Sequence, residues 1–271
     1  MKNNQKIGEA YRLELGLHSD DHELFYEYLL ISPSYRLAHE VVTGQGEALD
    51  MSSRINKWDL LLKNYALCGD VYSMPFLMWW DAIGRGLFYT KQSSGAYLPT
   101  GVLQLITNKI NEISLLECLG LVNDKARLQV RNAKRVENWR LGVETDIKSK
   151  WAQQLKGSTK KTHDNLEART TLGILVSKKL KEALYIAENA ARGAFPQSTP
   201  IDSALEFDYL SIYQLSKINI KMEFKNSIER KTNGLYVPKS YFARKVKPKQ
   251  DKAKKIQLEV ERQIKLRSGN S

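Results

Sequence analysis

The chain has 271 residues, of which 42% are hydrophobic, and it carries a formal net charge of +12. This apolar content is enough for a buried core and excludes wholesale disorder, while no apolar run reaches the roughly 20 residues that span a bilayer. The charge is uneven: residues 1–100 carry 9 Lys and Arg against 12 Asp and Glu, whereas residues 101–271 carry 33 against 18. Such separation indicates a polyanionic partner for the basic part.

The first hundred residues predict a strand followed by several short helices. Residues 11–17 alternate apolar and polar side chains, which is the period of a half-buried strand. A capping pattern at Asp20 opens a helix, and the Ser-Pro pair at 32–33 ends it and begins the next. Further helices are expected over 55–67 and from Pro75 onward. We therefore expect a helical N-terminal unit, 1–90, that contacts proteins, and a linker at 91–101.

Longer amphipathic helices are predicted after the linker. Residues 103–121 are apolar enough for a helix, and the apolar positions from 126 to 155 step by threes and fours. This second pattern predicts one long helix, or two helices broken near Gly142. A further long helix is expected over 166–192. Together these elements form the predicted basic, mainly helical domain, 102–228.

The C-terminal part adds a predicted strand and a basic tail. Residues 218–225 alternate strictly, which predicts a strand. Residues 229–271 hold 13 Lys and Arg against 4 Asp and Glu and form the predicted tail. The expected fold class is therefore mainly α with a few short β-strands: a helical N-terminal unit, then long amphipathic helices, then a basic C-terminal tail.

A basic helix face is the first candidate site. If Ala126 and Val130 face the core, the basic side chains of the same helix lie on the opposite face, where phosphates could bind. This face contains Arg127, Arg131, Lys134 and Arg135. A solvated charged face is the alternative. An apolar helix at 115–121 followed by a basic helix after Asp124 also has the order of a helix-turn-helix, although the apolar spacing fits that motif poorly.

The tail is the second candidate nucleic-acid-binding site. Tyr236, Tyr241 and Phe242 are interleaved with its basic residues, so base stacking and phosphate contacts could act together. Its densest part contains Arg244, Lys245, Lys247, Lys249, Lys252, Lys254 and Lys255. A solubilising tail or a helix that docks on a protein partner is the alternative.

A catalytic interpretation rests on three residues. Asp208 and the triplet from Glu223 to Lys225 are similar to the Asp…Glu-x-Lys signature of restriction-endonuclease-like nucleases. The resemblance implies that the two carboxylates hold Mg²⁺ on adjacent strands and that Lys225 assists the attacking water. The proline expected before the aspartate is absent, because Phe207 stands there.

Two other groups have simpler explanations. His18 and His22 flank Asp20 and Asp21 with metal-ligand spacing, but the capping role of Asp20 explains the cluster without an ion, so we expect no metal and no cofactor. The two cysteines of the chain are too few for a disulfide framework and lack partners at metal-ligand spacing, so both are expected in the core.

The sequence therefore predicts a cytoplasmic nucleic-acid-binding protein with no membrane segment, non-catalytic, acting in a nucleoprotein assembly or as a regulator. DNA and RNA both fit, and the N-terminal unit could bind protein partners. Two alternatives stay open: a Mg²⁺-dependent nuclease that uses Asp208, Glu223 and Lys225, and an adaptor subunit that binds an acidic protein.

Overall fold

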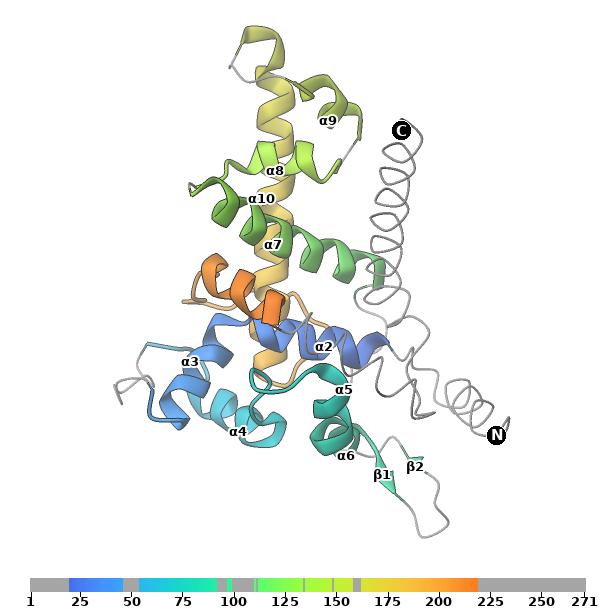
Figure 1. Cartoon of the computed structure of the whole chain (residues 1–271), viewed down its shortest axis with the longest axis vertical. Coiled ribbons are helices and arrows are strands. Elements are labelled where there is room, and N and C mark those ends of the chain that lie inside the picture. Colours follow the sequence, from blue (N-terminus) through green and yellow to red (C-terminus); the bar gives the residue numbers. More distant parts are fainter. Residues whose placement is uncertain are drawn as a thin grey trace, which may run out of the picture. The chain divides into compact units, whose positions relative to one another are not determined.

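The computed structural model is mainly helical, and α3, α4, α7, α8 and α9 pack on one long helix, α10 (Figure 1). The structure describes residues 20–45, 54–91, 97–98, 110, 112–133, 135–147, 149–157 and 162–218. Residues 21–218 form one compact unit, in which α10 packs on helices from both sides of the segment predicted as a linker. Within the described residues, no helix is long and apolar enough to cross a membrane.

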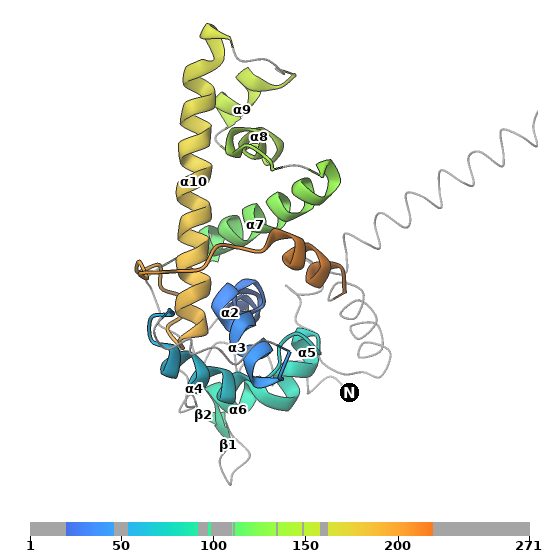
Figure 2. The ribbon, with the colours of Figure 1, turned by 90° about the vertical axis from the view of Figure 1, so that its left-hand side faces the viewer.

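Helix α10, His163–Ala191, confirms the long helix expected over 166–192. A capping box between Thr162 and Asn165 starts it, and Gly193 follows its end with a φ of +79°, a backbone conformation that glycine adopts without strain. Its neighbours follow one another along its length: α9 and α8 lie at the N-terminal end, α7 near the middle, and α3 and α4 at the C-terminal end (Figure 2).

The N-terminal helices also follow the sequence signals. Helix α2, Asp20–Ile31, is followed by α3, Pro33–Val42, and the Ser32 side chain caps α3 by accepting a hydrogen bond from the Tyr35 amide. Helix α4, Trp58–Cys68, ends at Gly69, whose φ is +68°. The cap, the proline at the first helical position and the terminal glycine were all visible in the sequence.

The apolar stripe after Pro75 forms a helix with one widened turn. Helices α5, Phe76–Trp79, and α6, Arg85–Phe88, flank a π-helical turn, η1, at Trp80–Gly84. A Cβ atom at Gly84 would lie 2.6 Å from Cζ3 of Trp79, so this turn needs glycine. The regular 3.6-residue stripe gave no sign of the extra residue in the turn.

The region expected to hold one long basic helix or two is broken into three helices. These are α7, Glu112–Asn132, α8, Asn138–Glu144, and α9, Ser149–Leu155. The chain leaves α7 at Ala133, whose φ of +49° is incompatible with a right-handed helix, and Val136 is buried in the connection. The break predicted near Gly142 corresponds to the end of α8 at Glu144, whereas the break after Ala133 was not predicted. The helix-turn-helix alternative fails, since α7 runs straight through Gly120.

The few short strands of the predicted fold class are not confirmed. The only strands of the described residues are two-residue segments, β1 at Thr90–Lys91 and β2 at Tyr97–Leu98, which pair antiparallel. The strand predicted over 11–17 lies outside the described residues. Of the strand predicted over 218–225, the structure describes only Ile218, which ends a helix at 209–218.

Buried polar groups lock the C-terminal end of α10 to α3 and α4. The Glu188 carboxylate accepts hydrogen bonds from the Ser32 hydroxyl (2.9 Å) and the Ser34 amide (3.0 Å), and lies 3.0 Å from Nη1 of Arg192. Asn64 of α4 donates to the carbonyls of the last two residues of α10. Glu188 is fully buried and Arg192 is 6% exposed, so this charge pair belongs to the core.

Candidate nucleic-acid interface

The predicted basic residues of α7 do not share one helix face. Arg127 and Arg131 lie in the last two turns of α7, whereas Arg135 lies in the connection to α8, and all three side chains are exposed. Lys134 is outside the described residues. The predicted face is therefore split between a helix end and a loop, because the chain leaves the helix at Ala133.

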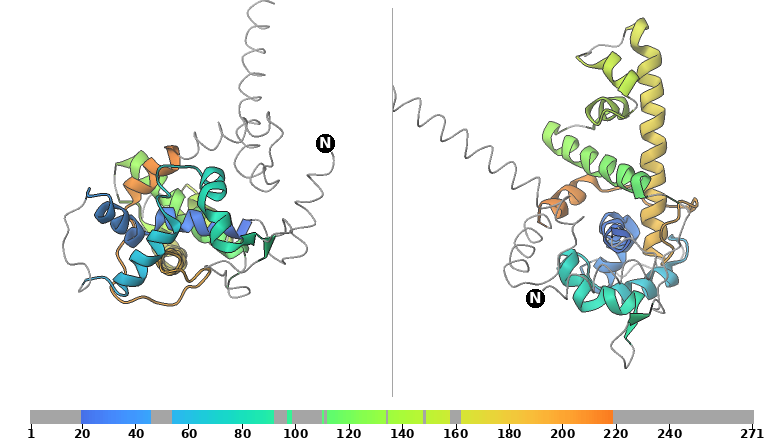
Figure 3. Two further views of the ribbon diagram at one scale, coloured as in Figure 1. Left: turned by 90° about the horizontal axis from the view of Figure 1, so that it is seen from below. Right: turned by 90° about the vertical axis from the view of Figure 1, so that its right-hand side faces the viewer.

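Lys125 is the centre of a junction that the sequence did not single out. Its Nζ donates to Oδ1 of Asn138 at 3.0 Å and lies 4.8 Å from the ring centroid of Tyr209. Nδ2 of Asn138 in turn donates to the Ser177 hydroxyl at 2.7 Å. The junction thus joins α7, α8, α10 and the helix at 209–218, which lies between α7 and α2 (Figure 3).

The junction is electropositive. Burial lowers the pKa of Lys125 below that of a free lysine, the nearby Arg135 charge lowers it further, and Glu206 opposes both effects. Burial raises the pKa of Tyr209 to about 12, with Glu206 acting in the same direction and Arg135 against it. Arg135 and Glu206 are therefore close enough to act on the same two buried groups.

The basic residues of this junction differ from others nearby in that they form no ion pair with an acid of the described residues. Arg127 lies 3.0 Å from Asp124, and Arg140 lies 3.4 Å from Glu137, so each has a local acid. Lys125, Arg131 and Arg135 form no salt bridge with any acid of the described part of the chain. An anion from outside would meet no competing ion pair at these three cations.

Helices α8 and α9 extend the basic surface along the N-terminal half of α10. Their small core contains Trp139, Ala152, Leu155, Ala168 and Leu172, and Arg140, Lys150 and Lys156 are exposed around it. The Trp139 ring is itself buried, with the guanidinium of Arg169 at 4.1 Å and that of Arg140 at 5.2 Å. Trp139 therefore packs in the core and is not a platform for base stacking.

Asp208 has a local structural role. Its Oδ1 accepts hydrogen bonds from the amides of Leu210 (3.1 Å) and Ser211 (3.2 Å), so it caps the helix at 209–218, and its Oδ2 lies 3.3 Å from Nη1 of Arg36. Partial burial alone would raise the pKa of Asp208, but the hydrogen bonds from Ser211 and the Arg36 charge outweigh it and hold the pKa below the usual value. Glu223 and Lys225, the other two residues of the nuclease hypothesis, lie outside the described residues.

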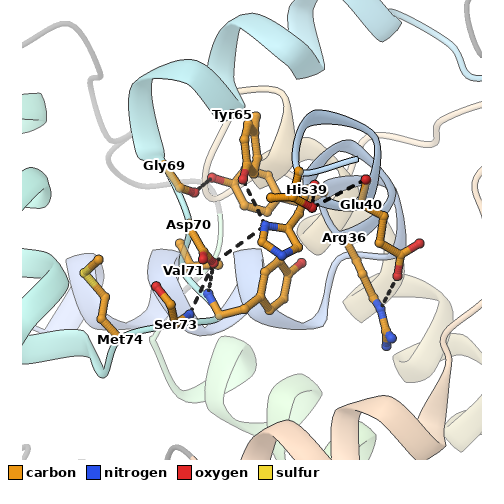
Figure 4. A network of polar contacts seen from close by, with 12 residues as sticks. Arg36, His39, Glu40, Tyr65, Gly69, Asp70, Val71, Ser73 and Met74 are labelled. Atoms are coloured by element: carbon orange, nitrogen blue, oxygen red, sulfur yellow. Dashed lines mark hydrogen bonds and ion pairs between the residues drawn. The ribbon is translucent and has the colours of Figure 1, made fainter. Parts of the chain in front are cut away.

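A second polar cluster, which the sequence did not predict, joins α3, α4 and the turn after Gly69 (Figure 4). Nδ1 of His39 lies 2.9 Å from the Tyr65 hydroxyl and 3.7 Å from Oδ1 of Asp70. The same Asp70 oxygen accepts hydrogen bonds from the amides of Tyr72 (2.8 Å) and Ser73 (3.2 Å). These groups use one another as partners, and the arrangement fixes the turn.

The histidine and cysteine predictions have mixed outcomes. His22 is buried against Trp80 and Phe88, 3.3 Å from the Tyr89 hydroxyl, and burial lowers its pKa to about 4. His18 lies outside the described residues, within which no group of three or more His, Cys, Asp or Glu could hold a metal ion. Both cysteines are buried and unpaired, as predicted for core residues.

The seven tail residues proposed as phosphate contacts, from Arg244 to Lys255, lie outside the described residues. The compact unit at 21–218 carries 24 Lys and Arg against 22 Asp and Glu, whereas residues 219–271 carry 15 against 5. Most of the net charge therefore belongs to the C-terminal segment.

No protein-family model, curated protein or solved structure matches the chain.

Proposed function

We propose that the protein binds nucleic acid in the cytoplasm, through the phosphate backbone and without catalysis. The junction around Lys125 and Arg135 and the basic tail are the proposed contacts. The observation that carries this proposal is the uneven ion pairing of the basic residues: Lys125, Arg131 and Arg135 form no salt bridge with an acid of the described residues. Cations that form no salt bridge can exchange their counterions for phosphates, which favours nucleic-acid binding.

The local charge supports the same proposal. Residues 125–161 contain 11 Lys and Arg against 3 Asp and Glu, and many of these residues lie on the α7–α8 connection and the α8–α9 surface. Within that surface the described tryptophan side chains are wholly or partly buried, so phosphate contacts rather than base stacking would supply the affinity there. Tyr236, Tyr241 and Phe242 in the tail remain the candidates for stacking.

The first experiment is purification without nuclease treatment, followed by the ratio of absorbance at 260 and 280 nm. We expect nucleic acid to co-purify and to be displaced by high salt, because phosphate contacts are screened. Labelled duplex DNA and RNA are then competed with polyglutamate at equal charge. Displacement by polyglutamate as effective as that by nucleic acid would support the adaptor for an acidic protein instead.

The nuclease alternative is tested in the same preparation. Labelled single- and double-stranded DNA and RNA are incubated with Mg²⁺ or Mn²⁺, and we expect no cleavage. Cleavage that disappears in Glu223→Gln but persists in the matched variant Glu229→Gln, which removes an equal charge from the neighbouring acid-x-Lys triplet, would contradict the non-catalytic proposal.

A further inference from the structure

The surroundings of Lys125 are unusual for a buried ammonium group because the two groups that it contacts are neutral. One is the Asn138 side-chain carbonyl, at 3.0 Å, and the other is the face of the Tyr209 ring. A buried charge ordinarily needs an opposite charge to offset the loss of water. No acid within the described residues forms a salt bridge with Lys125.

Arg135 makes this arrangement less favourable, because its positive charge is close enough to act on Lys125. It lies three residues before Asn138, the residue that holds the Lys125 ammonium, and its side chain is exposed. Two like charges held together by the fold repel each other, and a bound anion would remove that repulsion.

Glu206 is the nearby acid. It is exposed, and its charge acts on both Lys125 and Tyr209 without forming a salt bridge with the lysine. Two residues further along the chain, Asp208 caps the next helix and lies 3.3 Å from Arg36. Glu206 is therefore near enough to act on Lys125 but forms no salt bridge with it.

We infer that Lys125 and Arg135 form a site for one phosphate group, and that Glu206 weakens phosphate binding there. The inference deepens the proposed function and rests on it: the ligand is a phosphodiester group of the nucleic-acid backbone. Asn138 is a positioning residue, because it directs the ammonium group while its own amide is held by Ser177. The site differs from the remaining basic surface in being built from a buried group with fixed partners.

The test uses inorganic phosphate and the full chain. Phosphate is titrated at constant ionic strength, balanced with chloride, while the side-chain nitrogen signals of Lys125 and Arg135 are followed by NMR. We expect saturable binding on the order of millimolar. Arg135→Gln should weaken it by about tenfold, and Glu206→Gln should tighten it by about two- to fivefold because a competing negative charge is gone. Asp202→Asn, an equal charge change at an exposed position of the same loop, should have no effect.

Arg135→Gln and Glu206→Gln change exposed side chains, so the test does not depend on whether a Lys125 variant folds. Signal shifts that stay linear with phosphate, or that respond equally to Glu206→Gln and Asp202→Asn, would overturn the inference.

A duplex oligonucleotide separates this inference from the proposed function. Duplex binding that is unchanged in Arg135→Gln and Glu206→Gln, together with unsaturable phosphate binding, would refute the phosphate site and leave the proposed function standing. Saturable phosphate binding with the predicted order of variants, but no duplex binding, would support an anion site and refute the nucleic-acid proposal.

Discussion

At its C-terminal end α10 buries Glu188, with Arg192 as its C-cap, against α3, whereas near its middle the fold brings Lys125 and Arg135 together without a salt bridge to any acid of the described residues. In the first region every charge meets an opposite charge or a hydrogen-bond donor of the protein. In the second region the Lys125 ammonium group contacts only neutral groups. Glu206, the nearby acid, forms no salt bridge with it. The same long helix therefore supports two different regions: a closed network, in which Glu188 and Arg192 satisfy each other, and an open, electropositive junction around Lys125. We assign stability to the first and propose phosphate binding for the second.

Loss of the buried Glu188–Arg192 pair should have the largest effect on stability. Glu188→Ala leaves Arg192 buried without its carboxylate, so we expect the free energy of unfolding to fall by about 3–5 kcal/mol. Urea denaturation measures this loss. Glu40→Ala is the matched control, because it removes a partly exposed i,i+4 partner of Arg36 and should change stability by less than about 1 kcal/mol. Equal losses in the two variants would contradict the assignment.

The buried His22 of α2, outside both regions, predicts a pH dependence of stability. In the unfolded chain it takes up a proton near pH 6.5, but in the folded chain only near pH 4, so folding is favoured above 6.5 and loses stability as the pH falls between these values. The difference, 6.5 − 4 = 2.5 pH units, corresponds to about 3 kcal/mol. His22→Phe should remove this part of the pH profile, which thermal denaturation at several pH values measures. Superimposable profiles of the two proteins would show that His22 titrates normally.

Asp208 gives a smaller effect at the border of the open junction. Asp208→Ala removes the cap of the helix at 209–218 and should lower stability by about 1 kcal/mol. Asp208→Asn should recover most of this loss, because asparagine also caps helices well. Denaturation of the two variants provides the measurement, and an equal loss in both would mean that capping is not the role of this carboxylate.

The open junction itself should tolerate the loss of charge. Arg131→Gln with Arg135→Gln removes the charges of two exposed side chains that have no salt bridge to the described acids, so stability should change by less than about 0.5 kcal/mol. A loss comparable to that of Glu188→Ala, measured by the same denaturation, would make these arginines structural.

Several helices, but only part of the candidate site, could be predicted from the sequence. Local signals placed α3, α4 and α10 well, because the cap at Ser32 and the glycines after α4 and α10 act within a few residues. The end of α7 was not predicted, because the apolar spacing of the sequence continues past Ala133 even though the backbone turns there. The site was only partly predictable: Arg131 and Arg135 belonged to the basic pattern, but Lys125 is notable only because Asn138 and Tyr209, 13 and 84 residues away along the chain, surround it.

The salt dependence of binding tests the central assignment most directly. The logarithm of the duplex DNA binding constant is measured against the logarithm of the salt concentration for the parent chain and for three variants. Arg131→Gln with Arg135→Gln should flatten the slope by about 2, since each lost phosphate contact contributes about 0.9, and removal of residues 244–271 should flatten it by several units. Arg54→Gln with Lys63→Gln, an equal charge change at exposed positions around α4, should leave the slope unchanged. A slope that responds equally to both arginine and control pairs, or to neither, would contradict the assignment of binding to the open junction.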